Sequence, residues 1–271
     1  MFKFLRIPTT LLLLALIAYD GAAQNFRRKV EEPKHYELAT TSPKVSSEII
    51  THKGFTVSYN PQLLIPNWVA WELTPQEASA EDVSRQGEVF QRDPKARGAQ
   101  PLDSDYRQSG FDRGHMAPAA DMRWDQQAMT ESFYFTNICP QVKALNEGKW
   151  LELEQKCRWW AKKYKTPVYI VCGPFFATDQ ARFIGANEVV VPDAFFKCVL
   201  QQREGKWYAA GFVFINLDTR AESEPVYYPV TVLELVTGHK FFVNGDADIQ
   251  RALSLTINKE DWEIPGWKLQ K

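Results

Sequence analysis

The residues best suited to chemistry lie in one short segment, Ser109–Pro118. It brings an acid, a guanidinium and an imidazole together as Asp112, Arg113 and His115, with glycines among them and a proline at the end. Glycine adopts backbone conformations closed to other residues, and proline stiffens the chain, so the segment is suited to presenting side chains. Because histidine titrates near neutral pH, we predict that His115 is a general base.

A second polar cluster begins at Asn146 and continues to Glu154 and Arg158. A base, an amide oxygen, a carboxylate and arginines are the components of metal-assisted phosphodiester hydrolysis. On one helix, Asn146 and Glu154 would lie about 12 Å apart, too far for both to bind one ion directly. A hydrated Mg²⁺ resolves this, because the amide of Asn146 can bind the ion while the Glu154 carboxylate binds a coordinated water.

Each of these residues also has an ordinary structural interpretation. The Asp-Arg-Gly-His string could be a surface turn with a buried or solvated histidine. Asn146 could cap the N-terminus of the helix that follows it. Glu154 and Arg158 could form a surface ion pair at i, i+4 spacing. The sequence leaves these alternatives open.

The elements that must position these residues are predicted from apolar periodicity. The clearest is a helix over Ala144–Tyr164, whose apolar face recurs from Trp150 to Tyr164. Residues 75–108 are predicted to be long surface loops. Strands are predicted over 55–59, 68–73, 133–138, 168–172, 189–191, 195–200 and 207–215, and short helices over 125–132, 230–237 and 247–255. Without regular βαβ alternation, this order favours the α+β class with a mostly antiparallel sheet.

The N-terminal residues have the pattern of a secretory signal peptide. A basic start at Lys3 and Arg6 precedes the apolar run Leu11–Ala18 and the small residues at 21–23. We therefore expect a signal peptide over 1–23, a loosely ordered segment over 24–52 and one domain over 53–265, in a secreted or periplasmic protein. An uncleaved membrane anchor is the alternative for the first segment.

Composition limits the partners and the cofactors. The chain has 271 residues, 32 Lys and Arg, 33 Asp and Glu, and a formal net charge of −1. A polycation that coats nucleic acid is therefore excluded, and phosphate binding would need a local group of arginines. Four cysteines could form two disulfides or remain buried thiols: Cys139, Cys157, Cys172 and Cys198. They contain no CxxC pair, so structural zinc is not expected.

Several motifs occur in an order that resembles one known family. They are Asn67-Trp68-Val69-Ala70-Trp71, Asp112-Arg113-Gly114-His115, Phe133–Gln141, Asn146–Trp150 with Leu153-Glu154, and Val171–Pro174. With these motifs, over about residues 54–240, the chain resembles the non-specific DNA/RNA endonucleases of the ββα-metal fold. The resemblance implies a mostly antiparallel sheet and a long helix at the metal site.

The resemblance also implies a role for each candidate site residue. His115 would be the general base that activates water, supported by Asp112. Asn146 would be the single protein ligand of a hydrated Mg²⁺, for which Mn²⁺ could substitute, and Glu154 would hold the waters of that ion. Three arginines would bind the phosphate: Arg85, Arg113 and Arg158. Arg92 lies near Arg85 in the same loop and is the alternative to it.

The activity implied is Mg²⁺-dependent cleavage within DNA and RNA that leaves 5′-phosphate ends. No groove-reading helix or zinc finger is present in the sequence, so little base preference is expected. The expected partners are nucleic acid substrates and no membrane after signal removal, with a homodimer as one possible assembly. Two other classes stay open. One is a binding or inhibitory module on an inactive nuclease fold; the other is a serine or cysteine hydrolase, although no GxSxG occurs.

Overall fold

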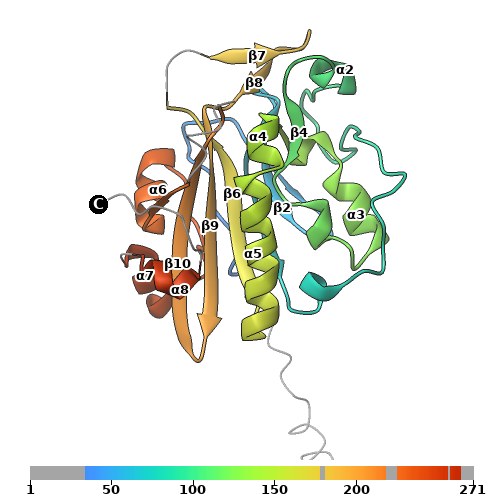
Figure 1. The fold of residues 1–271 in the computed structure, drawn as a ribbon. Helices are drawn as coiled ribbons and strands as arrows, with labels where there is room; N and C mark the ends of the chain where they lie inside the picture. The colour runs from blue at the N-terminus through green and yellow to red at the C-terminus, as the bar shows by residue number, and fades with distance from the viewer. Residues whose placement is uncertain (1–33, 178–180, 218–224, 256, 264–271) are drawn as a thin grey trace, which may run out of the picture. The chain divides into compact units, whose positions relative to one another are not determined.

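The computed structural model describes residues 34–177, 181–217, 225–255 and 257–263 (Figure 1). The chain divides into a short unit, Met1–Lys34, and a large unit, His35–Lys271. The described elements all lie in the large unit. The expected signal peptide, residues 1–23, lies outside the described residues. Within the described ranges, no helix combines the length and apolarity that a membrane span requires.

A seven-stranded antiparallel sheet forms the framework of the large unit. Its strand order is β1-β2-β3-β6-β9-β10-β11. The strands are β1 Glu48–Thr51, β2 Thr56–Asn60, β3 Ile65–Leu73, β6 Val168–Phe175, β9 Ala194–Arg203, β10 Lys206–Ile215 and β11 Val226–Tyr228. The sheet thus begins within the 24–52 segment that we expected to be loosely ordered, because β1 pairs with β2 along its whole length.

Strand β3 shows how the sequence covers both faces of this sheet. Val69 and Trp71 pack into one apolar core with residues of the long helix α5, Lys149–Tyr164. Trp68 and Ala70 pack into a second core on the other face. Successive side chains of a strand point to opposite faces, so a strand covered on both sides is apolar throughout.

The two faces carry different helices (Figure 1). Helix α5 covers the first face, and its apolar stripe supplies Trp150, Leu153 and Trp160 to the core. Helices α6 Val230–Thr237 and α7 Ala247–Ser254 cover the second face. The short helix α8, Lys259–Trp262, closes the α5 side, where Trp262 lies edge-on to Trp160 with ring centroids 4.8 Å apart.

Two small two-stranded sheets complete the described strands. Strand β4, Asp112–His115, pairs with β5, Ile138–Gln141, and β7, Arg182–Ile184, pairs with β8, Val189–Val191. The remaining elements are η1 Glu77–Ser79, α2 Asp103–Tyr106, η2 Ala119–Asp121, α3 Gln126–Ser132, η3 Phe135–Asn137 and α4 Lys143–Asn146. Together β4, β5 and α5 form a ββα unit, and the expected α+β class with a mostly antiparallel sheet is confirmed.

One predicted strand and the predicted long helix take a different form in the structure. Residues 133–138 do not form a strand, because Phe135–Asn137 is a 3-10 turn and pairing begins at Ile138. The helix expected over Ala144–Tyr164 is divided into α4 and α5 by Glu147 and Gly148. A side chain at Gly148 would collide with the carbonyl oxygen of Ala144, so this close passage requires glycine.

The cysteine alternatives are resolved in favour of thiols. All four cysteines are free and buried. Burial raises the pKa of the Cys157 and Cys172 thiols to about 12. Because nucleophilic attack requires a thiolate, the structure gives no support to a cysteine hydrolase.

Candidate active site

A polar cavity of about 440 Å³ lies where β4, α4 and the first turns of α5 meet. Its lining includes five of the six predicted site residues: Arg85, Arg113, His115, Asn146 and Glu154. The sixth, Arg158, is not among the lining residues. Residues from three separate parts of the sequence therefore meet at one cavity.

His115 is the last residue of β4 and is held on several sides. Its carbonyl oxygen accepts a hydrogen bond from Nε1 of Trp150 at 3.2 Å. The rings of Phe90 and Phe133 flank the imidazole, with centroids 5.4 Å and 4.9 Å away. Burial, together with the positive charge of Arg85, lowers the pKa of His115 to about 3. Its Nε2 is buried without a hydrogen-bond partner among the described residues. The result is a neutral imidazole that lines the cavity and has one ring nitrogen able to accept a proton.

The backbone on both sides of His115 is fixed by close contacts. Before it, Gly114 pairs with Cys139, and a side chain at Gly114 would collide with the buried side chain of Gln141. After it, Asn137 clamps Ala117 from both sides, because Oδ1 accepts from the Ala117 N–H and Nδ2 donates to its carbonyl oxygen, each at 2.9 Å. The sequence predicted a loop that presents side chains. In the structure the segment is instead a strand paired with β5, and Asn137 fixes the backbone that follows it.

Asn146 is the last residue of α4 and does not cap α5. The N-cap of α5 is Gly148, which makes no side-chain cap. Instead, Nδ2 of Asn146 donates a hydrogen bond to Oδ2 of Asp112 at 3.1 Å. This bond uses the amide donor, and no described residue donates to the amide oxygen. The capping alternative is therefore wrong, and Asp112 orients the amide as well as belonging to the His115 strand.

Glu154 is a buried carboxylate in the wall of the cavity, only 6% exposed. Burial raises its pKa to about 7, although Lys197 and Arg158 act in the opposite direction. Its ion-pair partner is Lys197 of β9, with Nζ 3.7 Å from Oε1. The i, i+4 surface pair with Arg158 does not form, because Arg158 binds elsewhere.

Arg158 binds Asp121 rather than lining the cavity. Its Nη1 donates to Oδ1 of Asp121 at 2.7 Å, and Nε1 of Trp71 donates to the other carboxylate oxygen at 3.0 Å. Burial by itself lowers the pKa of Arg158, but the charge and hydrogen bond of Asp121 outweigh it and raise the pKa above the ordinary value. In this structure the half-buried Arg158 forms an ion pair with the buried Asp121.

Arg113 and Arg85 supply positive charge at the cavity. Nη2 of Arg113 lies 2.6 Å from Oδ1 of Asp103, and the guanidinium lies over the rings of Phe90 and Tyr106, 5.5 Å from each centroid. Arg85 is exposed, and its guanidinium lies 5.5 Å from the centroid of Phe133. The alternative Arg92 is not among the lining residues.

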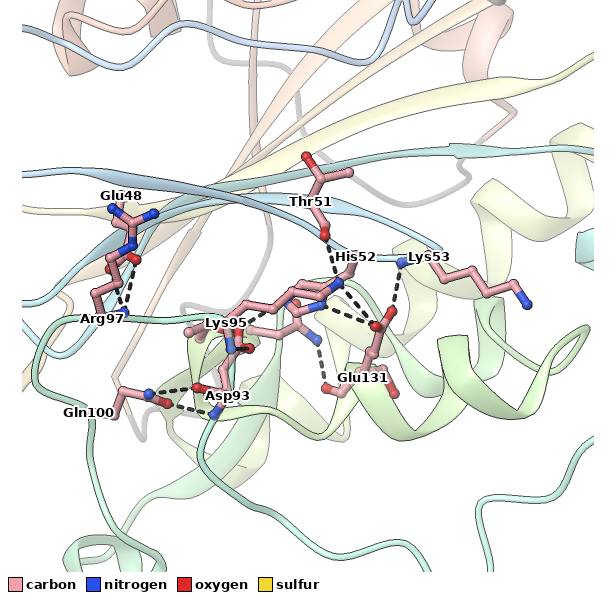
Figure 2. Close-up of polar contacts among 12 residues, drawn as sticks. Glu48, Thr51, His52, Lys53, Asp93, Lys95, Arg97, Gln100 and Glu131 are labelled. Atoms are coloured by element: carbon pink, nitrogen blue, oxygen red, sulfur yellow. Dashed lines mark hydrogen bonds and ion pairs between the residues drawn. The ribbon is translucent and has the colours of Figure 1, made fainter.

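A buried polar network that the sequence did not reveal holds the loop that carries Phe90 (Figure 2). Nε2 of His52 lies 2.9 Å from Asp93, and Nδ1 lies 3.6 Å from Glu131 of α3. Gln100 binds the backbone of Asp93 through both side-chain atoms, at 2.7 Å and 2.9 Å. The network joins the β1–β2 turn, the long loop and α3. It therefore fixes the loop whose Phe90 packs against the His115 ring.

Sequence reasoning also missed several residues that shape the site. Phe90 and Phe133 border the imidazole, Asp121 receives Arg158, and Lys197 faces Glu154. The one available signal was Lys197, a lysine within the otherwise apolar run of residues 194–200. Apolar strands seldom carry a buried lysine unless it is paired.

The donor set fits a hydrated cation. Among the described residues, no three His, Cys, Asp or Glu side chains gather as a direct metal site. An amide oxygen beside a carboxylate suits a hard divalent ion that keeps most of its waters. With a neutral imidazole and two arginines at the same cavity, the fold and the site define a phosphodiester hydrolase of the ββα class.

Comparison with known proteins gives the family. Residues 34–248 match the family model for DNA/RNA non-specific endonucleases, and the chain belongs to that family. Human mitochondrial endonuclease G is 30% identical over 220 residues, which cover 77% of this chain and 74% of that protein. The mitochondrial nuclease of Saccharomyces cerevisiae is 34% identical over 236 residues, covering 78% and 70%. A crystal structure of the EndoG/EndoGI complex matches with a TM-score of 0.67 and 29% identity, over 74% of this chain and 88% of that one.

The same comparisons correct the expected location. We expected a secreted or periplasmic protein from the N-terminal residues. The human, yeast, cattle and zebrafish relatives are mitochondrial nucleases by name. These names contradict export, so the expectation of a secreted or periplasmic product is wrong.

Proposed function

We propose that this chain is an Mg²⁺-dependent endonuclease that cuts within DNA and RNA without base preference and leaves 5′-phosphate ends, with Mn²⁺ able to replace Mg²⁺. The observation that carries the proposal is the neutral imidazole of His115 in the lining of a cavity that also contains Asn146 and Glu154. A neutral imidazole at such a cavity is positioned to take a proton from water.

In the proposed reaction, His115 removes a proton from a water molecule as the oxygen of that water attacks phosphorus. The bond from phosphorus to the 3′ oxygen breaks, and its electron pair leaves with that oxygen, which takes a proton and becomes a 3′-hydroxyl. The phosphate stays on the 5′ end of the other fragment. The lowered pKa of His115 keeps the ring in the form that accepts a proton across the neutral range.

The remaining residues hold the ion and the phosphate. The amide oxygen of Asn146, oriented by Asp112, would bind the cation, and Glu154 would accept hydrogen bonds from its waters. When bound, such a cation offsets negative charge on the phosphate and on the departing oxygen. Arg113 and Arg85 would contact the phosphate, since the guanidinium fork matches phosphate geometry.

For Arg158 we propose a positioning role in place of phosphate binding. Its guanidinium is committed to Asp121 at 2.7 Å, and its side chain is only 14% exposed. Asp121 also holds Trp71, which lies in the core under α5. Loss of Arg158 would leave a buried carboxylate without its cation, and this change would disturb the floor of the site.

Digestion of supercoiled plasmid and of RNA by purified protein tests the proposed function. Both substrates should be cut, a chelator should stop the reaction, and added Mg²⁺ should restore it. End-labelling should find 5′-phosphates at many different sequences. Cleavage that continues in chelator, or a fixed recognition sequence, would contradict the proposal, and binding without cleavage would favour the inactive-module alternative. A homodimer stays a prediction, which sedimentation velocity can check.

A further inference from the structure

Lys197 lies within β9 with its side chain completely buried. Its ammonium lies 3.9 Å from the ring centroid of Trp150 and 5.6 Å from that of Trp71. It is 3.7 Å from Oε1 of Glu154 and has no hydrogen-bond partner among the described residues. The one carboxylate beside this buried cation therefore belongs to the cavity wall.

The other ionisable groups around Lys197 are already matched or neutral. Asp121 of η2 and Arg158 of α5 bind each other at 2.7 Å. The thiols of Cys157 on α5 and Cys172 on β6 are buried with raised pKa values, so neither carries charge near neutral pH. Glu154 and Lys197 form the second pair beneath the cavity.

Stability alone does not explain why this buried ion pair is present. Taking a lysine and a carboxylate out of water often costs more free energy than their attraction returns, and apolar residues of similar volume can be as stable. The same face of β9 accepts apolar side chains at Phe195 and Val199, two residues to either side. A methionine at position 197 would therefore suit this core.

Resting on the mechanism proposed above, we propose that Lys197 is a positioning residue of the active site, which holds the Glu154 carboxylate at the cavity wall as the acceptor for the waters of the bound cation. Burial and the nearby Asp121 act to raise the pKa of Glu154, and Lys197 counteracts them. Without the ammonium, Glu154 would lose the ion-pair partner that lies 3.7 Å from its Oε1, and its pKa would rise further, so that less of the group would be a carboxylate at neutral pH. A neutral carboxyl accepts fewer hydrogen bonds from water than a carboxylate does.

Mg²⁺ binding to the full chain, measured by titration calorimetry, tests this role. Groups that orient a metal site from outside its first shell typically contribute about 10- to 100-fold to affinity, so Lys197→Met should weaken binding by about tenfold or more. The control is Lys206→Met, which removes an exposed lysine from the neighbouring strand β10 and should change affinity by less than about twofold. Folded Lys197→Met protein that binds Mg²⁺ as tightly as the parent would overturn the proposal.

A double-mutant cycle separates positioning from packing. In Glu154→Gln the carboxylate is gone, so adding Lys197→Met should weaken Mg²⁺ binding no further. A second loss of the same size would show that Lys197 acts by packing and would overturn the proposal. If Lys197→Met alone does not fold, the double variant decides, because neutralising both partners should restore folding; continued unfolding contradicts the pairing. A parent protein that binds no Mg²⁺ is a different result, since it defeats the proposed function itself.

Discussion

At the scale of single residues, substitutions of Asn146 distinguish a metal ligand from an amide with a purely structural role. Its side chain donates one hydrogen bond to a described residue, Asp112, and a hydrogen bond to a charged group contributes about 1.5–3 kcal/mol. Asn146→Ala should therefore melt only a few degrees below the parent in metal-free buffer, yet lose Mg²⁺ affinity and turnover by orders of magnitude. Asn146→Asp, which keeps an oxygen ligand but loses the donor to Asp112, should lie between. Calorimetry and a melting curve measure both effects, and an Asn146→Ala variant with unchanged Mg²⁺ titration would refute the ligand.

His115 should stay neutral over a wide pH range. Burial and Arg85 lower its pKa to about 3, and a lowered histidine pKa means that the charged ring is disfavoured in the folded protein. The NMR shifts of the His115 ring should therefore stay constant from about pH 8 to about pH 5. His35, with a side chain 58% exposed, serves as an internal comparison. A His115 midpoint near the ordinary value of about 6.5 would contradict the buried-base assignment.

At the scale of elements, the long loop depends on the network around His52. Burial alone would raise the pKa of Asp93, but hydrogen bonds from His52, Thr136 and the Lys95 N–H hold it below its usual range. Asp93→Asn should cost about 1–3 kcal/mol in urea unfolding, because the buried imidazole loses its charged acceptor. Asp248→Asn, which breaks an exposed pair with Arg251, should cost less than about 1 kcal/mol. Equal losses in the two variants would count against the network.

Apolar periodicity predicted the helices and strands whose buried positions repeat regularly. It failed where backbone contacts determine the local conformation. Leu145 and Trp150 are both buried, so the apolar pattern runs on through the break at Gly148 and predicts one helix instead of α4 and α5. Residues 133–138 are rich in β-forming side chains, yet the Phe135 N–H bonds to Gln91 from the distant loop. Such long-range partners override local propensity.

The chemistry of the site could be predicted from the sequence, but the ion pairs that hold its side chains could not. His115 and Asn146 stand in recognisable motifs, and their types alone suggest a base and an oxygen ligand. The pairing of Arg158 with Asp121 and of Glu154 with Lys197 depends on which groups meet across η2, α5 and β9. No spacing along one segment contains that information, so Arg158, expected at the phosphate, was found paired with Asp121 instead.

At the scale of the whole molecule, stability should fall in acid. Burial lowers the pKa of His115 to about 3 and that of His239 to about 4, so unfolding lets both take up protons below about pH 6.5. Asp93 and Glu131, whose pKa values are lowered, add a loss below about pH 4. Glu154, raised to about 7, opposes the trend between about pH 7 and 4.5. The urea midpoint should change little from about pH 7.5 to 6 and then fall; a maximum near pH 4 would contradict these assignments.

The two faces of the sheet carry different parts of the molecule. The face under α5 holds the Glu154–Lys197 and Arg158–Asp121 pairs and borders the cavity, whereas α6 and α7 cover the second apolar core. Predicted helices over 230–237 and 247–255 correspond to α6 and α7, but nothing in their sequences indicates which face they cover. That arrangement follows from the sheet order, in which β3 and β6 are neighbours although 94 residues separate Leu73 from Val168 in the chain.

The central claim is that the His115 imidazole is the proton acceptor for phosphodiester hydrolysis. The direct test is the rate of plasmid nicking by purified His115→Ala at saturating Mg²⁺, with folding checked by circular dichroism and Mg²⁺ binding by calorimetry. Positioned proton transfer contributes about 10²–10⁴-fold, so turnover should fall by at least a hundredfold while folding and Mg²⁺ affinity stay close to those of the parent. Folded His115→Ala protein that nicks plasmid within about tenfold of the parent rate would contradict the account.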